Sequence, residues 1–476
     1  MRIEEHPILE FERKKKMKFF FNGEEVWGYD NESIAAALFA DGYKVFTYSS
    51  EKRRPRGAFC MIGKCSSCLM TVNGIPNVRT CKLPVEEGID VKMQVGKAEF
   101  LDIRENFEVK RKKIDTEILV IGGGPAGLCA AISASKYGAK VLLVDEQFIL
   151  GGQLIKQTHK FFGSTEHFAG VRGIYIADKL KKEIEKYGVE VLLKTTVIGI
   201  YEGKKIAAVK EESFGREFYE ISAKRIIIAT GAMEKTLIFE NNDLPGVMGA
   251  GGVQTLMNVY GVKPGNRALI VGAGNVGVIV GYQMLQAGME VVAVVEALPT
   301  IGAYQVHASK LRRYGVPIYT RHTILKAHGK EWVEGATIVQ INERFSPIEG
   351  SEKYVDCDLI LIAVGLQPSY KLARMAGCSL KYVPELGGFV VPRKRNLETD
   401  VEGIYVCGDV SGIEEASTAM MEGHIAGISA ALSLGYGGKE AENEREYWYK
   451  ALEEFRSGPY SEKVKKGYEK MLIGGE

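Results

Sequence analysis

The sequence is poor in the features that mark several classes of protein. Its 476 residues include only eight cysteines, too few for a secreted scaffold built on disulfides. There are only 14 prolines, and the 55 glycines follow no G-X-Y period, which excludes a collagen-like chain. The 62 basic and 60 acidic residues nearly cancel, so no field of one sign favours nucleic acid as a partner.

The sequence also lacks the patterns of a secretory leader and of a membrane span. Residues 1–6 have no basic start, apolar core or small-residue cleavage site, which leads us to expect a cytoplasmic protein. Residues 268–289 are uncharged, but their five glycines, one Asn and two Gln argue against a transmembrane segment. The 46% of hydrophobic residues suffice for several cores, and the length suggests about three domains.

The N-terminal region predicts a small unit of strands around one helix. A strand is expected at residues 18–21, a hairpin turn at Asn22-Gly23, and a helix at residues 34–40 with Ser33 as its N-cap. A second hairpin and a closing strand are expected within residues 69–93. Residues 103–115 are rich in charge, and we expect them to form a linker.

Four of the eight cysteines lie within this unit, spaced Cys60-x4-Cys65-x2-Cys68-x12-Cys81. Three thiolates on one loop and a fourth from a later hairpin are typical of the plant-type ligation of a [2Fe-2S] cluster. Neighbouring glycines and serines leave backbone N–H groups free to face the cluster sulfurs. A zinc site with four thiolates and a set of unligated thiols are the alternatives.

From residue 116 onward, short β-branched runs alternate with glycine turns and alanine-rich helices. This alternation is typical of βαβ units on a parallel sheet. It occurs twice, with opening strands expected at residues 117–121 and 267–271, so the sequence predicts a duplicated nucleotide-binding architecture.

The first glycine fingerprint, Gly122-x-Gly124-x-x-Gly127, lies between an expected strand and an expected helix. Its glycines permit the turn, the approach of a pyrophosphate, and close packing of helix on strand. Asp145 ends the next expected strand, where a carboxylate can accept hydrogen bonds from an adenosine ribose, and Glu146 is the alternative ligand. We predict a dinucleotide or adenine nucleotide here; an unused relic of the fold is the alternative.

The second fingerprint is Gly272-x-Gly274-x-x-Gly277, again between an expected strand and an expected helix. Glu296 ends its next strand, and no Arg or Lys stands near it to bind a 2′-phosphate. The pattern therefore leaves NAD(H), another adenine nucleotide, or a retained but unused fold.

Three blocks of sequence resemble those of flavoproteins with two dinucleotide-binding domains. The blocks are Gly122-Gly123-Gly124-Pro125-Ala126-Gly127, Ala229-Thr230-Gly231-Ala232, and residues 399–409, which end in Gly408-Asp409. The resemblance implies that Asp409 holds the ribityl chain of a flavin, and an ordinary helix N-cap is its alternative role. It also implies that the segment containing Gly152 and Gln153 approaches the cofactor.

The remaining cysteines form no C-x-x-C pair, so the dithiol chemistry of thioredoxin- or lipoamide-type reductases is not expected. They are Cys129, Cys357, Cys378 and Cys407, and we expect them to be small buried hydrophobic residues.

An N-terminal module similar to a β-grasp ferredoxin, fused to a flavoprotein without a dithiol, resembles the α subunits of dye-linked L-proline dehydrogenases over about residues 17–435. It is similar also to subunits of heterotetrameric sarcosine oxidase, opine dehydrogenase and hydrogen cyanide synthase. The implied fold class is α/β, Rossmann-like, of the FAD/NAD(P) type. The expected domains are a [2Fe-2S] domain at 1–102, a linker at 103–115, a first dinucleotide domain at 116–250 and 355–436, a second at 251–354, and a helical segment at 437–476.

The resemblance implies an electron-transfer subunit that works with an FAD-containing β subunit, in αβ units of a larger oligomer. Electrons from the amine would pass through an FMN at the subunit interface to the [2Fe-2S] cluster, and then to an acceptor such as a ferredoxin or a quinone. The first nucleotide site would hold FAD or ATP. Some members carry a second cysteine cluster, but no cysteine follows Cys407 here, which suggests that another subunit supplies it. The alternatives are a stand-alone NAD(P)H:acceptor reductase and a non-catalytic, ATP-binding regulatory subunit.

Overall fold

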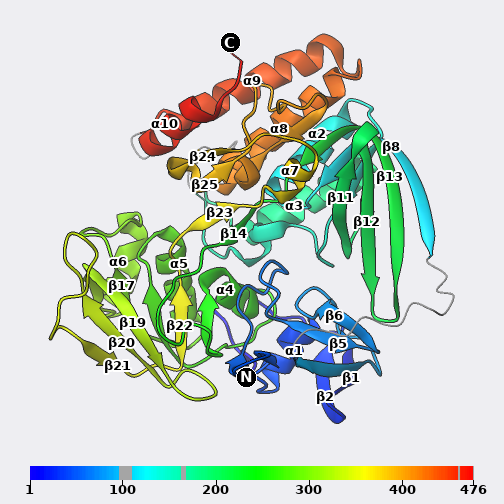
Figure 1. The fold of residues 1–476 in the computed structure, drawn as a ribbon. Coiled ribbons are helices and arrows are strands. Elements are labelled where there is room, and N and C mark those ends of the chain that lie inside the picture. The colour runs from blue at the N-terminus through cyan, green and yellow to red at the C-terminus, as the bar shows by residue number, and fades with distance from the viewer. Residues whose placement is uncertain (96–109, 162–167, 459–460, 475–476) are drawn as a thin grey trace. The chain divides into compact units, whose positions relative to one another are not determined.

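The computed structural model describes residues 1–95, 110–161, 168–458 and 461–474 (Figure 1). The chain forms two compact units, each assembled from distant parts of the sequence. Unit 1 consists of Met1–Glu105 with Glu234–Gly365, and unit 2 of Asn106–Met233 with Leu366–Glu476.

The N-terminal part of unit 1 is a mixed sheet with one helix against it. Its elements are β1 (Lys16–Phe21), β2 (Glu24–Tyr29), α1 (Ile34–Ala40), β3 (Thr47–Tyr48), β4 (Pro55–Arg56), β5 (Leu69–Val72), β6 (Ile75–Arg79) and β7 (Asp90–Val95). The strand order is β2-β1-β7-β3-β4, and β5 pairs with β6 and β7. Asn22 and Gly23 both have positive φ, as the expected hairpin turn requires, and the hydroxyl of Ser33 accepts a hydrogen bond from Ala36 N at 3.2 Å.

The second part of unit 1 contains a parallel sheet of order β15-β22-β16-β17-β18. Between β18 and β22 the chain forms a separate antiparallel sheet, β19-β20-β21. The elements are β15 (Val247–Gly249), α4 (Ala250–Asn258), β16 (Arg267–Val271), α5 (Asn275–Gln286), β17 (Glu290–Glu296), α6 (Gln305–Arg313), β18 (Ile318–Thr320), β19 (His322–His328), β20 (Gly335–Gln340), β21 (Lys353–Val355) and β22 (Leu359–Ile362). The central strands β16 and β22 are buried throughout except at Arg267, as a sheet covered on both faces requires.

Unit 2 is built on the sheet β10-β9-β8-β13-β12-β11, and β26 pairs with β13. Its first half contains β8 (Arg111–Ile121), α2 (Pro125–Lys136), β9 (Val141–Val144), η1 (Gly152–Lys156), α3 (Gly173–Lys186), β10 (Glu190–Leu192), β11 (Thr195–Tyr201), η3 (Glu202–Lys204), β12 (Lys205–Glu212), β13 (Gly215–Ile228) and β14 (Ala232–Glu234). Its second half contains β23 (Leu366–Pro368), which pairs with β14, then α7 (Lys371–Met375), β24 (Lys381–Val383), η4 (Pro384–Leu386), β25 (Gly388–Val390), β26 (Ile404–Val406), η5 (Gly408–Ser411), α8 (Ala416–Leu432), α9 (Gly438–Arg456) and α10 (Glu462–Met471).

The start of β8 corrects the sequence-based expectation. The strand begins at Arg111 rather than at 117, so residues 111–115 of the expected linker are strand. They pair in parallel with residues 218–222 of β13, and Lys112 and Lys113 form ion pairs with Glu217 and Glu220. The charged composition therefore marks an exposed strand extension; residues 103–109 lie outside the described ranges.

Helices α2 and α8 pack closely because α8 carries glycines at the contact. A Cβ at Gly423 would lie 2.2 Å from the carbonyl oxygen of Ala126, and one at Gly427 would lie 2.2 Å from that of Ala130. This approach brings α8 against the N-terminal turns of α2, where the first fingerprint ends. The expected α/β architecture with two nucleotide-type sheets is confirmed. The sheet of unit 2 is parallel from β10 to β13, whereas β12 and β11 pair antiparallel at its edge.

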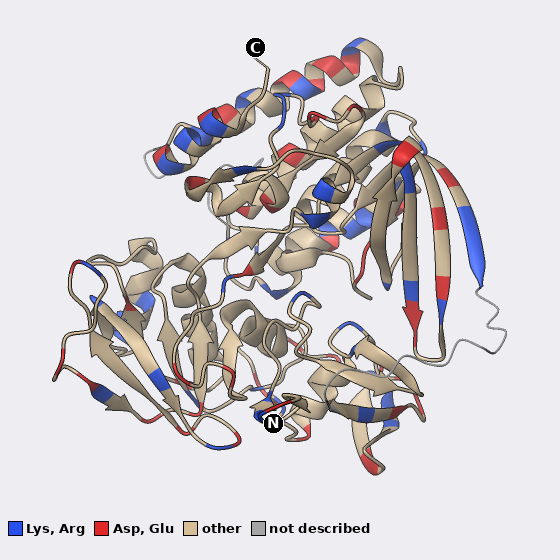
Figure 2. Ribbon diagram, viewed as in Figure 1, with Lys and Arg blue, Asp and Glu red and all other residues tan. Residues whose placement is uncertain are grey.

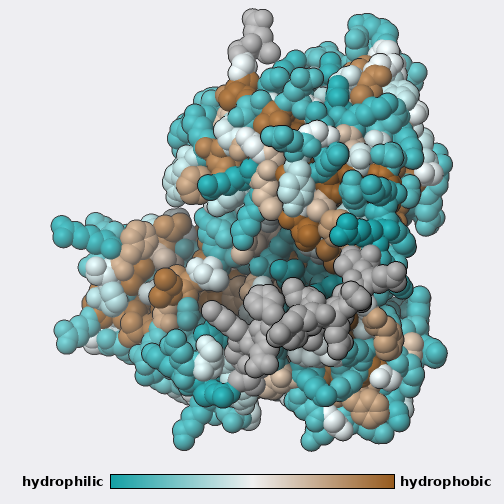
Figure 3. Space-filling view, turned by 45° about the vertical axis from the view of Figure 1, so that its right-hand side comes forward, coloured by the Kyte–Doolittle hydropathy of each residue, from teal (hydrophilic) through white to brown (hydrophobic). Residues whose placement is uncertain are grey.

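Acidic and basic residues are interspersed along the described elements, in agreement with the balanced composition (Figure 2). On the face drawn in Figure 3, hydrophobic and hydrophilic residues are likewise mixed. Within the described ranges, no helix is long and apolar enough to cross a membrane.

Candidate cofactor sites

The first glycine loop connects β8 to α2 and has the tight geometry that the fingerprint predicts. Gly122 has a φ of 111°, and a Cβ there would lie 2.4 Å from the carbonyl oxygen of Ala229. A Cβ at Gly127 would lie 1.8 Å from the carbonyl oxygen of Gly122. Larger residues are excluded at both positions, and Pro125 stands at the first position of α2, where its missing N–H costs nothing.

Asp145 lies at the end of β9 and faces this loop. Its carboxylate accepts hydrogen bonds from the backbone N–H groups of Gly123, at 2.5 Å, and of Gln147, at 2.7 Å. A carboxylate oxygen can accept more than one hydrogen bond, so the same group can also bind a ribose hydroxyl. The structure thus gives Asp145 a second role that the sequence did not indicate, because the carboxylate also orders the glycine loop. Glu146 is half-buried and follows it directly.

The other predicted residues of the first site converge on the same loop. The N–H of Gly151 donates to the carbonyl of Gly123 at 2.9 Å, and a Cβ at Gly152 would lie 2.6 Å from Cα of Gly124. Gln153 follows in η1. A Cβ at Gly408 would lie 2.9 Å from the Cβ of Ala126.

The segment Thr230-Gly231 also lies beside the first glycine loop, because it directly follows Ala229, whose carbonyl oxygen packs against Gly122. The hydroxyl of Thr230 donates to the carbonyl of Ser369 at 3.0 Å, and Gly231 has a φ of 63°. The structure therefore brings all three sequence blocks of the first site together within unit 2.

Asp409 follows Gly408 in η5 and is half-buried. Burial raises the pKa of its carboxyl to about 7, and the charges of Glu414 and Glu422 act in the same direction. Its Oδ1 accepts a hydrogen bond from the backbone N–H of Glu414 at 3.4 Å. A carboxyl whose pKa is raised by burial beside a glycine loop is a candidate functional group.

The second glycine loop, between β16 and α5, repeats the first in detail. Gly272 has a φ of 110°, and a Cβ there would lie 2.4 Å from the carbonyl oxygen of Ala363; one at Gly277 would lie 2.2 Å from that of Gly272. Glu296 accepts hydrogen bonds from the backbone N–H groups of Ala273, at 2.7 Å, and of Leu298, at 2.9 Å. The two acids thus have equivalent positions in the two halves.

The two glycine loops differ in how closely other residues approach their middle glycines, Gly124 and Gly274. A Cβ at Gly274 would meet no atom within 4 Å, whereas Gly152 closes over Gly124 in the first site. Asn275, which the sequence did not single out, accepts a hydrogen bond from the N–H of Tyr304 at 2.9 Å. The sequence could have indicated this contact, because Asn275 is the first residue of α5 and its amide oxygen can accept a backbone hydrogen bond.

The four clustered cysteines are arranged as two pairs. Interaction between Cys60 and Cys65 lowers the pKa of Cys65 to about 5 and raises that of Cys60. Interaction between Cys68 and Cys81 likewise lowers the pKa of Cys68 and raises that of Cys81, and electrostatic interactions connect the two pairs. Among the described residues, no three His, Cys, Asp or Glu side chains converge on one point that could hold a single metal ion.

Two pairs of thiolates, each pair on its own iron, match the donor set of a [2Fe-2S] cluster. The loop is also suitably built: Cys60, Cys68 and Cys81 are buried, and the N–H of Ser67 points to the sulfur of Cys65 at 3.5 Å.

The cysteine loop packs directly on the second nucleotide domain, within unit 1. The N–H of Gly249 donates to the carbonyl of Phe59 at 3.2 Å, and a Cβ at Gly252 would lie 2.2 Å from the same oxygen. Arg54 forms an ion pair with Asp243 at 2.6 Å. The chain order, in which the first nucleotide domain intervenes, gave no indication of this association.

The other four cysteines are buried and form no disulfide, as expected. Burial raises the pKa of each thiol, which makes the thiolate form unfavourable.

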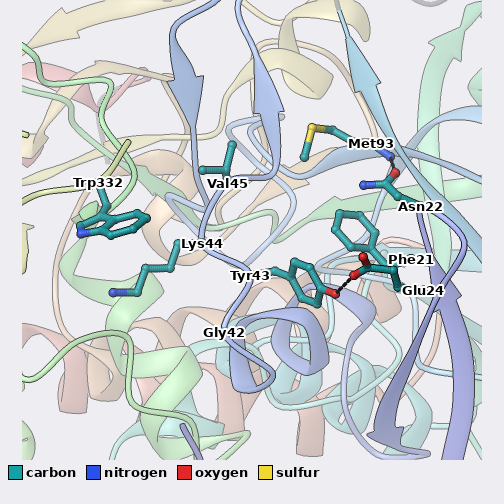
Figure 4. A pocket seen from close by; sticks show the side chains of 9 residues that line it. All are labelled: Phe21, Asn22, Glu24, Gly42, Tyr43, Lys44, Val45, Met93 and Trp332. Atoms are coloured by element: carbon teal, nitrogen blue, oxygen red, sulfur yellow. Dashed lines mark hydrogen bonds between the residues drawn. The ribbon is translucent and has the colours of Figure 1, made fainter. Parts of the chain in front are cut away.

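A cavity of about 470 Å³ also lies in unit 1, but it contains none of the predicted site residues (Figure 4). Lys44 lies near the ring of Trp332 on one side, and the hydroxyl of Tyr43 donates to Glu24 at 2.7 Å on the other.

The comparisons with known proteins define the class. Residues 116–423 match the family described as pyridine nucleotide-disulphide oxidoreductase, and residues 14–96 match a 2Fe-2S iron-sulfur cluster binding domain. Because the first match covers more than half of the chain, the protein belongs to that family of oxidoreductases. The iron-sulfur and flavin-type domains expected from the motifs are confirmed as domains.

Particular relatives agree with the resemblance found in the motifs. The chain is 25% identical over 451 residues to the alpha subunit of sarcosine oxidase from Corynebacterium sp. (strain P-1), covering 91% of this chain and 45% of that protein. It is 28% identical over 340 residues to an opine oxidase subunit from Rhizobium meliloti (strain 1021), covering 67% and 71% respectively. The fold is similar to that of L-proline dehydrogenase from P. horikoshii, with a TM-score of 0.68 at 24% identity over 93% of this chain and 79% of that one. The chain spans about half the length of the sarcosine oxidase subunits that it matches.

Proposed function

We propose that this chain is the electron-transfer subunit of a heteromeric dye-linked dehydrogenase that oxidises L-proline or a related secondary amine. The observation that carries the proposal is the paired set of four thiols on a domain of the 2Fe-2S type, joined to a flavoprotein fold without a reactive dithiol. A one-electron carrier on such a fold serves to pass electrons onward.

The four cysteines would hold the [2Fe-2S] cluster, and the first glycine loop with Asp145 and Asp409 would hold FAD or ATP. Flavin supplies two-electron chemistry with one-electron release when it is bound. In the proposed route, an FAD-containing β subunit would take electrons from the amine, and an FMN at the subunit interface would connect it to the cluster and to an acceptor such as a ferredoxin or a quinone. The sarcosine oxidase and opine oxidase relatives are themselves named as subunits, which supports a partner of this kind.

The decisive experiment co-expresses the chain with the products of neighbouring reading frames and assays dye reduction. L-proline, hydroxyproline, sarcosine and an opine are each tested with the co-purified complex and with the chain alone. We expect turnover with one of these amines only in the complex. Turnover at ordinary enzyme rates of ~1–10³ s⁻¹ by the isolated chain would contradict the proposal.

A second candidate function is an NAD(P)H:acceptor reductase, favoured by the open space above Gly274 and the ordered carboxylate of Glu296. Rapid bleaching of the bound flavin by NADH in the isolated chain would select it. No bleaching would leave the second glycine loop without a role in the reaction and would support the first candidate.

A further inference from the structure

A buried cluster of charged side chains lies against η5 within unit 2. Its members come from the segment after β25, the loop before α8, α8, α9 and α10; they are Arg393, Glu414, Glu422, Arg456 and Tyr468. Arg393 and Glu422 are each only 1% exposed, so each depends on its partners rather than on water for stabilisation.

Glu422 is the centre of this charge cluster. Its Oε2 accepts hydrogen bonds from the backbone N–H of Gly408 at 2.8 Å and from Nη1 of Arg393 at 2.9 Å. Its Oε1 accepts from Nη2 of Arg456 at 2.5 Å and lies 3.3 Å from the hydroxyl of Tyr468. Burial would raise the pKa of Glu422, but the two arginines outweigh it and lower the pKa to about 2. The carboxylate is therefore ionised and fixes Gly408, whose φ of 73° requires a defined turn.

Glu414 links the same cluster to Asp409. Its backbone N–H donates to Asp409, while its side chain accepts hydrogen bonds from Nε of Arg456 at 3.0 Å and from the hydroxyl of Tyr468 at 3.1 Å. The guanidinium of Arg456 lies 3.8 Å from the ring centre of Tyr468. A Cβ at Gly412 would lie 3.0 Å from that hydroxyl, so Tyr468 also abuts the end of η5.

Tyr468 is held in place by the packing of α10. It shares a small hydrophobic core with Val383, Leu386, Val390 and Met471, and it is 6% exposed. Charges of both signs follow one another along α9 and α10 (Figure 2). The inward side chains Arg456 and Tyr468 are thus the means by which these helices reach the Asp409 loop.

We propose that Arg456 and Tyr468 are positioning residues of the first nucleotide site, which hold Glu414 and Glu422 so that Gly408 and Asp409 keep their binding conformation. Nucleotide binding and the docking of α10 then stabilise one another, because coupling between two sites is reciprocal. The inference rests on the proposed assignment of Asp409 to nucleotide binding and extends it to helices outside the predicted site.

The charge balance of the cluster makes this proposal testable. Asp409 faces two carboxylates, Glu414 and Glu422, whose charges are offset by Arg393 and Arg456; the residue of α2 in contact with Gly408 is Ala126, which does not titrate. Removing Arg456 takes away the guanidinium that Glu414 and Glu422 share, so the two carboxylates lose the contact that holds them beside Gly408 and Asp409.

The experiment titrates nucleotide-free full-length protein with FAD and, separately, with ATP between pH 6 and pH 9. Three variants are compared with wild type: Arg456→Met, Tyr468→Phe, and the control Arg445→Met on the same helix. In wild type, affinity should rise with pH through a midpoint near 7. Arg456→Met should weaken binding by up to about tenfold, because Glu414 and Glu422 lose a shared hydrogen-bond donor. Tyr468→Phe should weaken binding a few-fold, and Arg445→Met should not change it.

Amide hydrogen exchange of α10, measured with and without nucleotide, provides a readout that a loss of folding would not imitate. Bound nucleotide should slow exchange in α10 of wild type and have less effect in Arg456→Met. Wild-type affinity in both Arg456→Met and Tyr468→Phe would overturn the inference while leaving the nucleotide site intact. If wild type binds neither FAD nor ATP, the proposed assignment of the site is wrong and the inference falls with it.

Discussion

Replacing Asp145 by Ala tests whether the first glycine loop binds a nucleotide. The change removes the acceptor for two backbone N–H groups, of Gly123 at 2.5 Å and of Gln147 at 2.7 Å. Leaving such donors without a partner costs about 1–3 kcal/mol each when buried. Because Asp145 is only half-buried, water compensates in part, and we expect the free energy of unfolding of unit 2 to fall by about 1–3 kcal/mol.

Asp145→Ala should also lower the affinity of the first site for nucleotide, and this effect should be confined to that site. A charge-assisted hydrogen bond to a ribose hydroxyl is worth about 1.5–3 kcal/mol, which corresponds to a loss of roughly ten- to a hundredfold in affinity. Asp145→Asn retains one acceptor oxygen, so its nucleotide affinity should lie between those of Asp145→Ala and wild type. Glu296→Ala is the matched control, since it removes the equivalent carboxylate from the second loop.

Isothermal titration of nucleotide-free protein with FAD and ATP, together with thermal unfolding, separates the two effects. The expected pattern is a loss of affinity in Asp145→Ala that exceeds its loss of stability, with first-site affinity unchanged in Glu296→Ala. Unchanged nucleotide content in both Asp145→Ala and Glu146→Ala would show that the first fingerprint is an unused relic, and the reasoning would be refuted.

Three further predictions concern the cysteine loop and the buried charges. Cys81→Ser should lose iron and acid-labile sulfide while nucleotide binding by unit 2 persists; stoichiometric iron in this variant would contradict the proposed ligand set. Gly252→Val forces side-chain atoms against the carbonyl of Phe59, 2.2 Å from the Cβ position, and should reduce the iron retained per chain; full iron content at wild-type stability would count against the packing described. Glu422→Gln leaves two arginines without their shared carboxylate and should lower the free energy of unfolding by about 3–5 kcal/mol. Because the folded pKa of Glu422 is about 2 against 4.5 ordinarily, its stabilisation is fully present above pH 4.5 and is lost as pH falls toward 2; thermal unfolding across this range should show a loss that the variant lacks.

Local sequence patterns predicted much of the fold because they depend on neighbouring residues. Ser33 caps its helix, and the Asn-Gly turns have the positive φ angles that their residue types permit. The first and third glycines of both fingerprints lie where a side chain would collide with a carbonyl oxygen. In these places the chemistry of one residue decides the local backbone.

The parts that were not predicted depend on contacts between distant residues. Glu422 can accept a hydrogen bond from Gly408 only when α8 packs on α2. The hydrogen bond from Arg456 to Glu422 likewise requires the end of α9 to lie against α8. Residues 111–115 were misassigned because their strand partner lies more than a hundred residues later. Cysteine spacing predicted the proposed ligand set, but the division of the four thiols into two pairs emerges only from the folded loop.

The proposed role of this chain is to receive electrons from a partner subunit and to carry them on an iron-sulfur cluster. Low-temperature electron paramagnetic resonance, recorded after adding L-proline or another secondary amine anaerobically, detects that transfer directly. We expect the signal of a reduced [2Fe-2S] cluster in the co-purified complex, with two irons per chain, and no such signal from the isolated chain. One zinc and no iron in an anaerobically prepared, folded sample, or cluster reduction by the amine in the isolated chain, would contradict it.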